Sequence, residues 1–151
     1  MERNMAARFD ASAMNKVIGY RLRRAQSYIF QQFDERFARL KLRPAEYSVL
    51  ELIADNPGCQ QGTMAKALGI KRANFVGLIQ GLDARGLTAR GQQPGDKRAN
   101  ALYLTPAGQA TIVEAREIQA EFERHCVELL GGEAERDHLL TLLDRLAPTA
   151  D

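Results

Sequence analysis

Helical periodicity runs through almost the whole chain and is interrupted once, between residues 87 and 104. From Ile18 to Leu40 apolar residues recur at spacings of three and four, which predicts one long amphipathic helix over about residues 12–40. Two short, partly alternating segments in the interruption flank a stretch rich in turn formers, which predicts a β-hairpin. The pattern therefore predicts a mainly α fold with one small hairpin. The further helices are expected at 44–55, 60–68, 71–85, 106–130 and 133–146.

Proline and glycine mark the ends of the predicted helices. Pro44 and Pro106 stand at first helical positions, where a missing N–H costs nothing, and Thr105 supplies a capping oxygen. Gly69 and Gly86 follow the last apolar residues of two central helices, as expected of helix-ending glycines. The central helices are therefore short and joined by tight turns.

Length and composition limit the class of protein. The chain has 151 residues, the size of one domain with an extension, and 45% of them are hydrophobic. No apolar run approaches the roughly 18 to 20 residues of a membrane helix, and the N-terminus leads into no signal-peptide core. Two cysteines are too few for a disulfide framework. These features predict a cytoplasmic protein with no membrane partner.

Charge is unevenly distributed although the net charge is only +2. Residues 1–43 carry ten basic and four acidic side chains, whereas residues 106–151 carry four and ten. The central segment, 44–105, carries seven and five. This asymmetry suggests different roles for the two ends, although solvated faces or an intramolecular electrostatic match would produce the same pattern.

Two short helices, a tight turn and a hairpin form a winged helix-turn-helix pattern over residues 44–105. The polar residues of the second helix, Lys71, Arg72 and Asn74, gather at its N-terminus, where helix dipole and free N–H groups favour phosphate. The rest of that helix is expected to face the core. Arginine and asparagine can read guanine and adenine edges. The pattern favours double-stranded DNA as the partner, and a protein-docking winged helix remains the alternative.

The motifs of this segment resemble the MarR family of bacterial transcription regulators. The resemblance covers about residues 68–108 and rests on LDARGL at 82–87, Arg90, GDKR at 95–98 and LYLTPAG at 102–108. It implies a homodimer in which helical regions 1–43 and 106–151 interlock and two winged domains read a pseudo-palindrome. The flanking apolar stripes would supply the dimer interface.

The resemblance also assigns roles to single residues. Arg98 is expected in the minor groove and Lys97 at phosphate, while Asp96 would shape the wing tip by pairing with Arg90. Residues at the start of the first short helix are expected to contact backbone phosphate: Gln60, Gln61 and Thr63.

Gly77 and Gly81 depart from the family pattern, which often has larger polar or basic residues there. Each glycine costs about 0.5–1 kcal/mol relative to alanine inside a helix. Either the helix backbone approaches something closely along this face, or base reading is confined to residues 71–76.

The chain is expected to respond to a small-molecule effector and to act as a repressor. The sequences of residues 72–76 and 101–104 resemble those of regulators of aromatic acid breakdown. This resemblance implies an aromatic acid or its coenzyme A thioester as effector. A basic cluster on the first helix could anchor the thioester phosphates, next to an aromatic pocket. The candidate residues are Arg21, Arg23, Arg24, Tyr28, Arg39 and Tyr47.

Other chemistries find little support. Redox sensing through Cys59 or Cys126 remains an alternative, because a thiolate pKa cannot be read from sequence. The adjacent His125 and Cys126 do not match a zinc-site spacing, and we expect no metal. Both histidines lie near the C-terminus and form no nucleophile–base set, so we expect no catalytic residues and no enzyme activity. No cofactor is implied.

Overall fold

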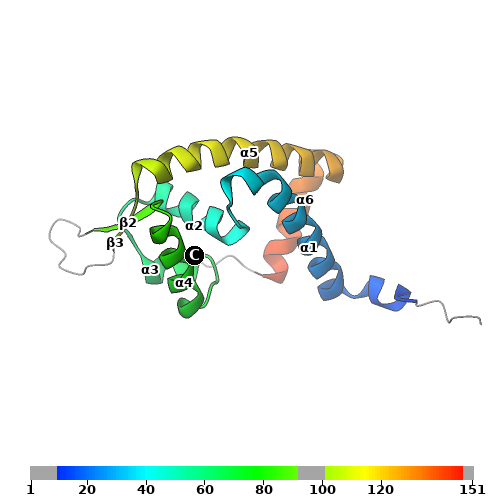
Figure 1. Ribbon diagram of the computed structural model, residues 1–151. Coiled ribbons are helices and arrows are strands. Elements are labelled where there is room, and N and C mark those ends of the chain that lie inside the picture. The colour runs from blue at the N-terminus through cyan, green and yellow to red at the C-terminus, as the bar shows by residue number, and fades with distance from the viewer. Residues whose placement is uncertain (1–9, 92–100, 148–151) are drawn as a thin grey trace, which may run out of the picture.

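The computed structural model describes residues 10–91 and 101–147, which are mainly helical. A single long helix, α5, runs along one side of the molecule (Figure 1). The three-stranded sheet lies at its N-terminal end, while α1 and α6 lie toward its C-terminal end. The elements are η1 (Ser12–Lys16), α1 (Ile18–Phe37), η2 (Ala38–Leu40), α2 (Pro44–Asp55), β1 (Cys59–Gln60), α3 (Gln61–Ala67), α4 (Arg72–Ala84), β2 (Thr88–Gly91), β3 (Ala101–Leu104), α5 (Pro106–Leu130) and α6 (Glu133–Leu146).

The first helix differs from its prediction at both ends. Residues 12–16 form a 3-10 turn, Val17 is extended, and the α-helix begins at Ile18. At the other end residues 38–40 tighten into a second 3-10 turn, and Lys41 adopts a left-handed φ of 51°. The apolar stripe ends at Leu40, inside the second turn, so spacing alone could not show where the α-helical hydrogen bonds end.

The sheet has three strands in the order β1-β3-β2, one more than the predicted hairpin. The predicted strands β2 and β3 pair in antiparallel register, with Arg90 opposite Leu102. The unpredicted strand β1 pairs Cys59 with the same Leu102 across the other edge of β3. A strand of two residues is too short to show alternation, and only the open edge of β3 makes it a strand.

The core lies between the winged-helix elements and the N-terminal two thirds of α5. Its fully buried side chains come from α1, α2, α4, β3 and α5 and include Phe37, Leu50, Ile79, Leu102 and Ala115. Phe33 and Phe37 stack with ring centroids 3.8 Å apart, and Tyr47 packs edge-on against Phe37. The winged-helix elements and the long helices therefore share one hydrophobic core.

Large apolar side chains remain exposed on the parts of the helices that lie outside this core. Helix α6 contains no buried residue, and Ile18 near the start of α1 is 63% exposed. None of the helices in the described ranges is both long and apolar enough to cross a membrane.

Candidate nucleic-acid interface and effector pocket

Helix α4 is oriented by one apolar face. Phe75, Ile79 and Leu82 lie one turn apart and are fully buried. The turn before it is made by Gly69, whose φ of 62° is readily adopted only by glycine. The three buried anchors fix the rotation of the helix about its axis, so the opposite face is held toward solvent.

The three polar residues predicted at the N-terminus of α4 lie together and are exposed. Lys71 is the N-cap residue, Arg72 is the first helical residue, and Asn74 follows two positions later. The side chains of these three residues have no hydrogen-bond or ion-pair partner within the described ranges. Free side chains beside unpaired helix N–H groups can bind phosphate or base edges.

Gln80 also lies on the exposed face of α4, contrary to the expectation that the rest of this helix faces the core. Its neighbours along that face are Ala73, Gly77 and Ala84, all small and exposed. A helical projection of the sequence could have found Gln80, since it falls outside the buried face formed by Phe75, Ile79 and Leu82.

The residues predicted to touch phosphate near α3 occupy two elements rather than one. Gln60 lies in β1 and precedes the helix, whereas Gln61 is its first residue and Thr63 is exposed in its first turn. Gln60 lies in a strand and not in the predicted helix, because β1 pairs with β3. In the described structure the side-chain Nε2 of Gln61 is buried without a hydrogen-bond partner.

At the base of the wing, Arg90 lies on β2 and donates to the carboxylate of Asp83, with 3.2 Å between Nε and Oδ2. The same carboxylate accepts from the buried hydroxyl of Thr88 at 2.5 Å. This contact fastens the end of α4 to β2. The predicted wing-tip residues Asp96, Lys97 and Arg98 lie outside the described residues.

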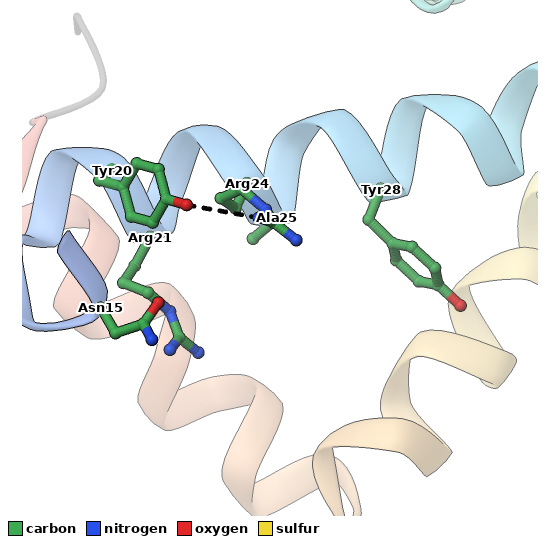
Figure 2. Close-up of a pocket in the computed structure, with 6 residues that line it drawn as sticks. All are labelled: Asn15, Tyr20, Arg21, Arg24, Ala25 and Tyr28. Atoms are coloured by element: carbon green, nitrogen blue, oxygen red, sulfur yellow. Dashed lines mark hydrogen bonds between the residues drawn. The ribbon is translucent and has the colours of Figure 1, made fainter. Parts of the chain in front are cut away.

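Three of the predicted effector residues line a pocket on α1. Arg21, Arg24 and Tyr28 occupy successive turns and border a hollow of about 420 Å³, together with Asn15, Tyr20 and Ala25. Figure 2 shows the hydroxyl of Tyr20 directed to the guanidinium of Arg24, at 3.3 Å. Two guanidinium groups beside aromatic rings suit a ligand that carries both phosphate and an aromatic group.

The other three predicted effector residues lie elsewhere. Arg23 is exposed on the same helix but does not border the pocket. Arg39 forms an ion pair with Glu114 of α5 at 2.7 Å. Tyr47 is half-buried against the stacked phenylalanine rings, and burial together with Glu51 raises its pKa to about 12.

Both cysteines are half-buried free thiols. Burial raises the pKa of Cys59 and of Cys126, which disfavours the thiolate that oxidation requires. Across the described residues no group of three or more potential ligands is arranged to hold a metal ion.

Known proteins with similar sequences and structures are transcription regulators. The model of the MarR family matches residues 40–99. The regulatory protein assigned to the hcr operon of Thauera aromatica is 32% identical over 130 residues, which cover 85% of this chain and 78% of that protein.

Solved structures of the transcriptional repressor CouR cover nearly the whole chain. One, bound to a 23-mer DNA duplex, is 39% identical with a TM-score of 0.84 and covers 93% of this chain and 99% of the other. Another, bound to p-coumaroyl-CoA, is 37% identical with a TM-score of 0.82 and covers 93% and 98%. The similarity therefore includes the long helices as well as the winged-helix elements.

Proposed function

This chain belongs to the MarR family of winged helix-turn-helix transcription regulators, and we propose that it binds a pseudo-palindromic operator as a homodimer and represses transcription in the cytoplasm. In this proposal residues 44–105 are the DNA-binding domain, and residues 1–43 and 106–151 form the dimerisation region. The wing, with Arg98 in the minor groove and Lys97 at phosphate, would complete the contact.

One observation carries the DNA-binding proposal. Lys71, Arg72 and Asn74 stand free at the N-terminus of a helix whose other face is locked into the core. An exposed helix end with these residue types fits the major groove, and Arg72 and Asn74 have the donors and acceptors to read base edges. The similarity to a repressor bound to a DNA duplex supports the same placement.

The proposed dimer rests on the exposed apolar residues of α1 and α6. A 14-residue helix with no fully buried residue gains little hydrophobic stabilisation in an isolated chain, so α6 is expected to need a partner surface. A second copy would bring two α4 helices to half-sites about one DNA turn apart.

We further propose that the effector is the coenzyme A thioester of an aromatic acid. Arg21 and Arg24 would bind the phosphates, and Tyr28 would pack against a ring of the ligand. The similarity to CouR bound to p-coumaroyl-CoA supports a ligand of this class. Ligand binding shifts the equilibrium between the DNA-bound and DNA-free forms only by the difference in its affinity for the two forms.

Fluorescence anisotropy tests DNA binding, with duplexes from the region upstream of the gene, an unrelated duplex as control, and two salt concentrations. We expect tight binding to one upstream duplex and a steep salt dependence. Arg72→Ala should weaken binding and relax sequence preference, while Arg98→Ala should weaken binding to all duplexes and flatten the salt slope. No binding to any duplex at low salt would instead favour a protein-docking module.

The same assay tests the effector. p-Coumaroyl-CoA should release wild-type protein from the duplex, and Arg21→Gln or Arg24→Gln should raise the concentration required about tenfold or more, because each removes a charge-assisted contact to phosphate. Arg23→Gln removes the same charge outside the pocket and should respond like wild type. Release that is insensitive to all three substitutions would contradict this placement.

A further inference from the structure

The exposed face of α4 contains one long polar side chain among small residues. Ala73, Gly77, Gln80 and Ala84 fall within about 60° of arc on a helix with 100° between residues. All four are exposed, and Gly81 is exposed beside them. Gln80 is therefore the one side chain in this row that extends beyond Cβ.

Neither glycine in this face is required by the fold. Both lie inside a regular helix without the positive φ that favours glycine. A Cβ added at Gly77 or Gly81 would meet nothing within 4 Å. Because alanine would fit and would stabilise the helix, the reason for the glycines lies outside the folded chain.

The character of the face indicates what lies against it. The large exposed apolar residues belong to other segments of the described chain, among them α1, α5 and α6, and none belongs to α4. A polar amide on a surface without large apolar side chains is unsuited to protein docking, but it matches the donors and acceptors of base edges.

We propose that Gln80 is a specificity-determining residue that reads an adenine in the major groove, and that Gly77 lets the middle of α4 approach the bases closely enough for this contact. The inference rests on the proposed DNA-binding function. Glutamine can donate to N7 and accept from N6 of adenine as a bidentate pair. A larger residue at position 77 would hold the helix backbone away from the groove.

Gln80 has the free hydrogen-bonding groups that this role requires. Its side chain makes no hydrogen bond with any other residue in the described ranges. It follows Asn74 by six residues, or about 9 Å along the helix axis. The two amides would therefore address different base pairs, and readout would extend beyond residues 71–76.

The test is selection of binding sites from a pool of random-sequence duplexes by wild type, Gln80→Ala and the control Gln109→Ala, which removes an exposed glutamine from α5. Wild type and Gln109→Ala should select the same symmetric motif. Gln80→Ala should lose the preference for adenine at one pair of symmetry-related positions, with discrimination falling about tenfold per half-site. Its salt slope should be unchanged, since an amide neutralises no phosphate.

Replacing that adenine by 7-deazaadenine, which lacks the N7 acceptor, distinguishes base contact from an indirect structural effect. The replacement should weaken wild-type binding and leave Gln80→Ala unaffected. If Gln80→Ala selects the wild-type motif, or lowers the affinity for all duplex sequences equally, the inference is overturned while the proposed function stands. If wild type selects no motif, both fail.

Gly77→Ala tests the close approach. We expect its melting temperature to rise, its non-specific DNA affinity to stay unchanged, and its affinity for the selected motif to fall about tenfold. Undiminished affinity for the motif would overturn this part of the inference.

Discussion

Gly108 lies in the first turn of α5, against Leu87, the residue before strand β2. It is buried, and a Cβ there would overlap the backbone carbonyl oxygen of Leu87. Thr105 reinforces the junction: its hydroxyl donates to the carbonyl of Gly86 at 2.5 Å and accepts from the amide of Gly108 at 3.0 Å. The glycine of the LTPAG motif is thus required by a close backbone approach within the fold.

Gly108→Ala should destabilise the protein by about 1–3 kcal/mol, because the overlapping atom is backbone and cannot rotate away. Urea denaturation measures this effect. Gly62→Ala, where a Cβ meets nothing within 4 Å, is the control and should be neutral or stabilising. Equal stability of the two variants would contradict the close approach.

Asp83 holds the end of α4 against β2 through its bonds to Thr88 and Arg90. Asp83→Ala leaves the buried Thr88 hydroxyl without this acceptor and should cost about 1–3 kcal/mol in the free energy of unfolding. A double-mutant cycle with Thr88→Val measures the coupling. Additive effects of the two substitutions would show that the bond contributes nothing.

At the scale of elements, Arg85 connects the C-terminal end of helix α4 to the segment between α1 and α2. Its guanidinium donates to the carbonyls of Leu40 and Lys41, at 2.9 and 3.0 Å, and lies 3.6 Å from Glu46. These carbonyls belong to the last turn of η2 and to the left-handed residue after it. Movement of α1 would therefore reach α4 through this side chain.

Arg85→Lys should lower stability by about 1–3 kcal/mol, because a lysine keeps the charge but cannot bond two carbonyls as a rigid fork. Hydrogen exchange at residues 38–43 should accelerate. The effector should also release the variant from DNA less effectively than wild type. Unchanged exchange and unchanged release would mean that Arg85 does not couple these helices.

Helix α5 is tied to the winged-helix elements by ion pairs as well as by the core. Arg116 contacts Glu51 at 2.9 Å and Asp55 at 2.7 Å, both on α2, and Glu114 pairs with Arg39. These pairs are exposed, so each contributes little to stability. They link α5 to α2 and, through Arg39, to η2.

At the scale of the whole molecule, the apolar residues left exposed on α1 and α6 suit the proposed association of two chains. Leu140→Asp in α6 should shift the protein toward monomer, because it places a charge in the proposed apolar interface. Light scattering after size-exclusion chromatography measures the mass. Val113→Asp changes an exposed residue in the N-terminal half of α5 and should remain dimeric.

Thermal unfolding provides an independent test of the same proposed interface. The melting temperature of wild type should rise with protein concentration, and that of Leu140→Asp should not. A monomeric wild type, or a dimeric Leu140→Asp, would contradict the placement of the interface on α6.

The order of helices, the two hairpin strands and the junction at Thr105 followed from local signals. These signals are apolar spacing, an N-cap threonine followed by proline, and helix-ending glycines. Each acts within a few residues, so each can be recognised from the sequence. The polar N-terminus of α4 was predicted for the same reason. The expectation that the rest of α4 faces the core does not hold at Gln80, because a helix with a buried apolar row also has an exposed face.

Sequence by itself therefore determined the fold class and the family, because periodicity and short motifs are local. Tertiary structure decided that Cys59 and Gln60 form a strand, because pairing depends on an edge contributed by residue 102. It also decided that Arg21, Arg24 and Tyr28 share a pocket while Tyr47 packs elsewhere. Contacts between distant segments depend on how faces meet in space, which spacing along the chain does not encode.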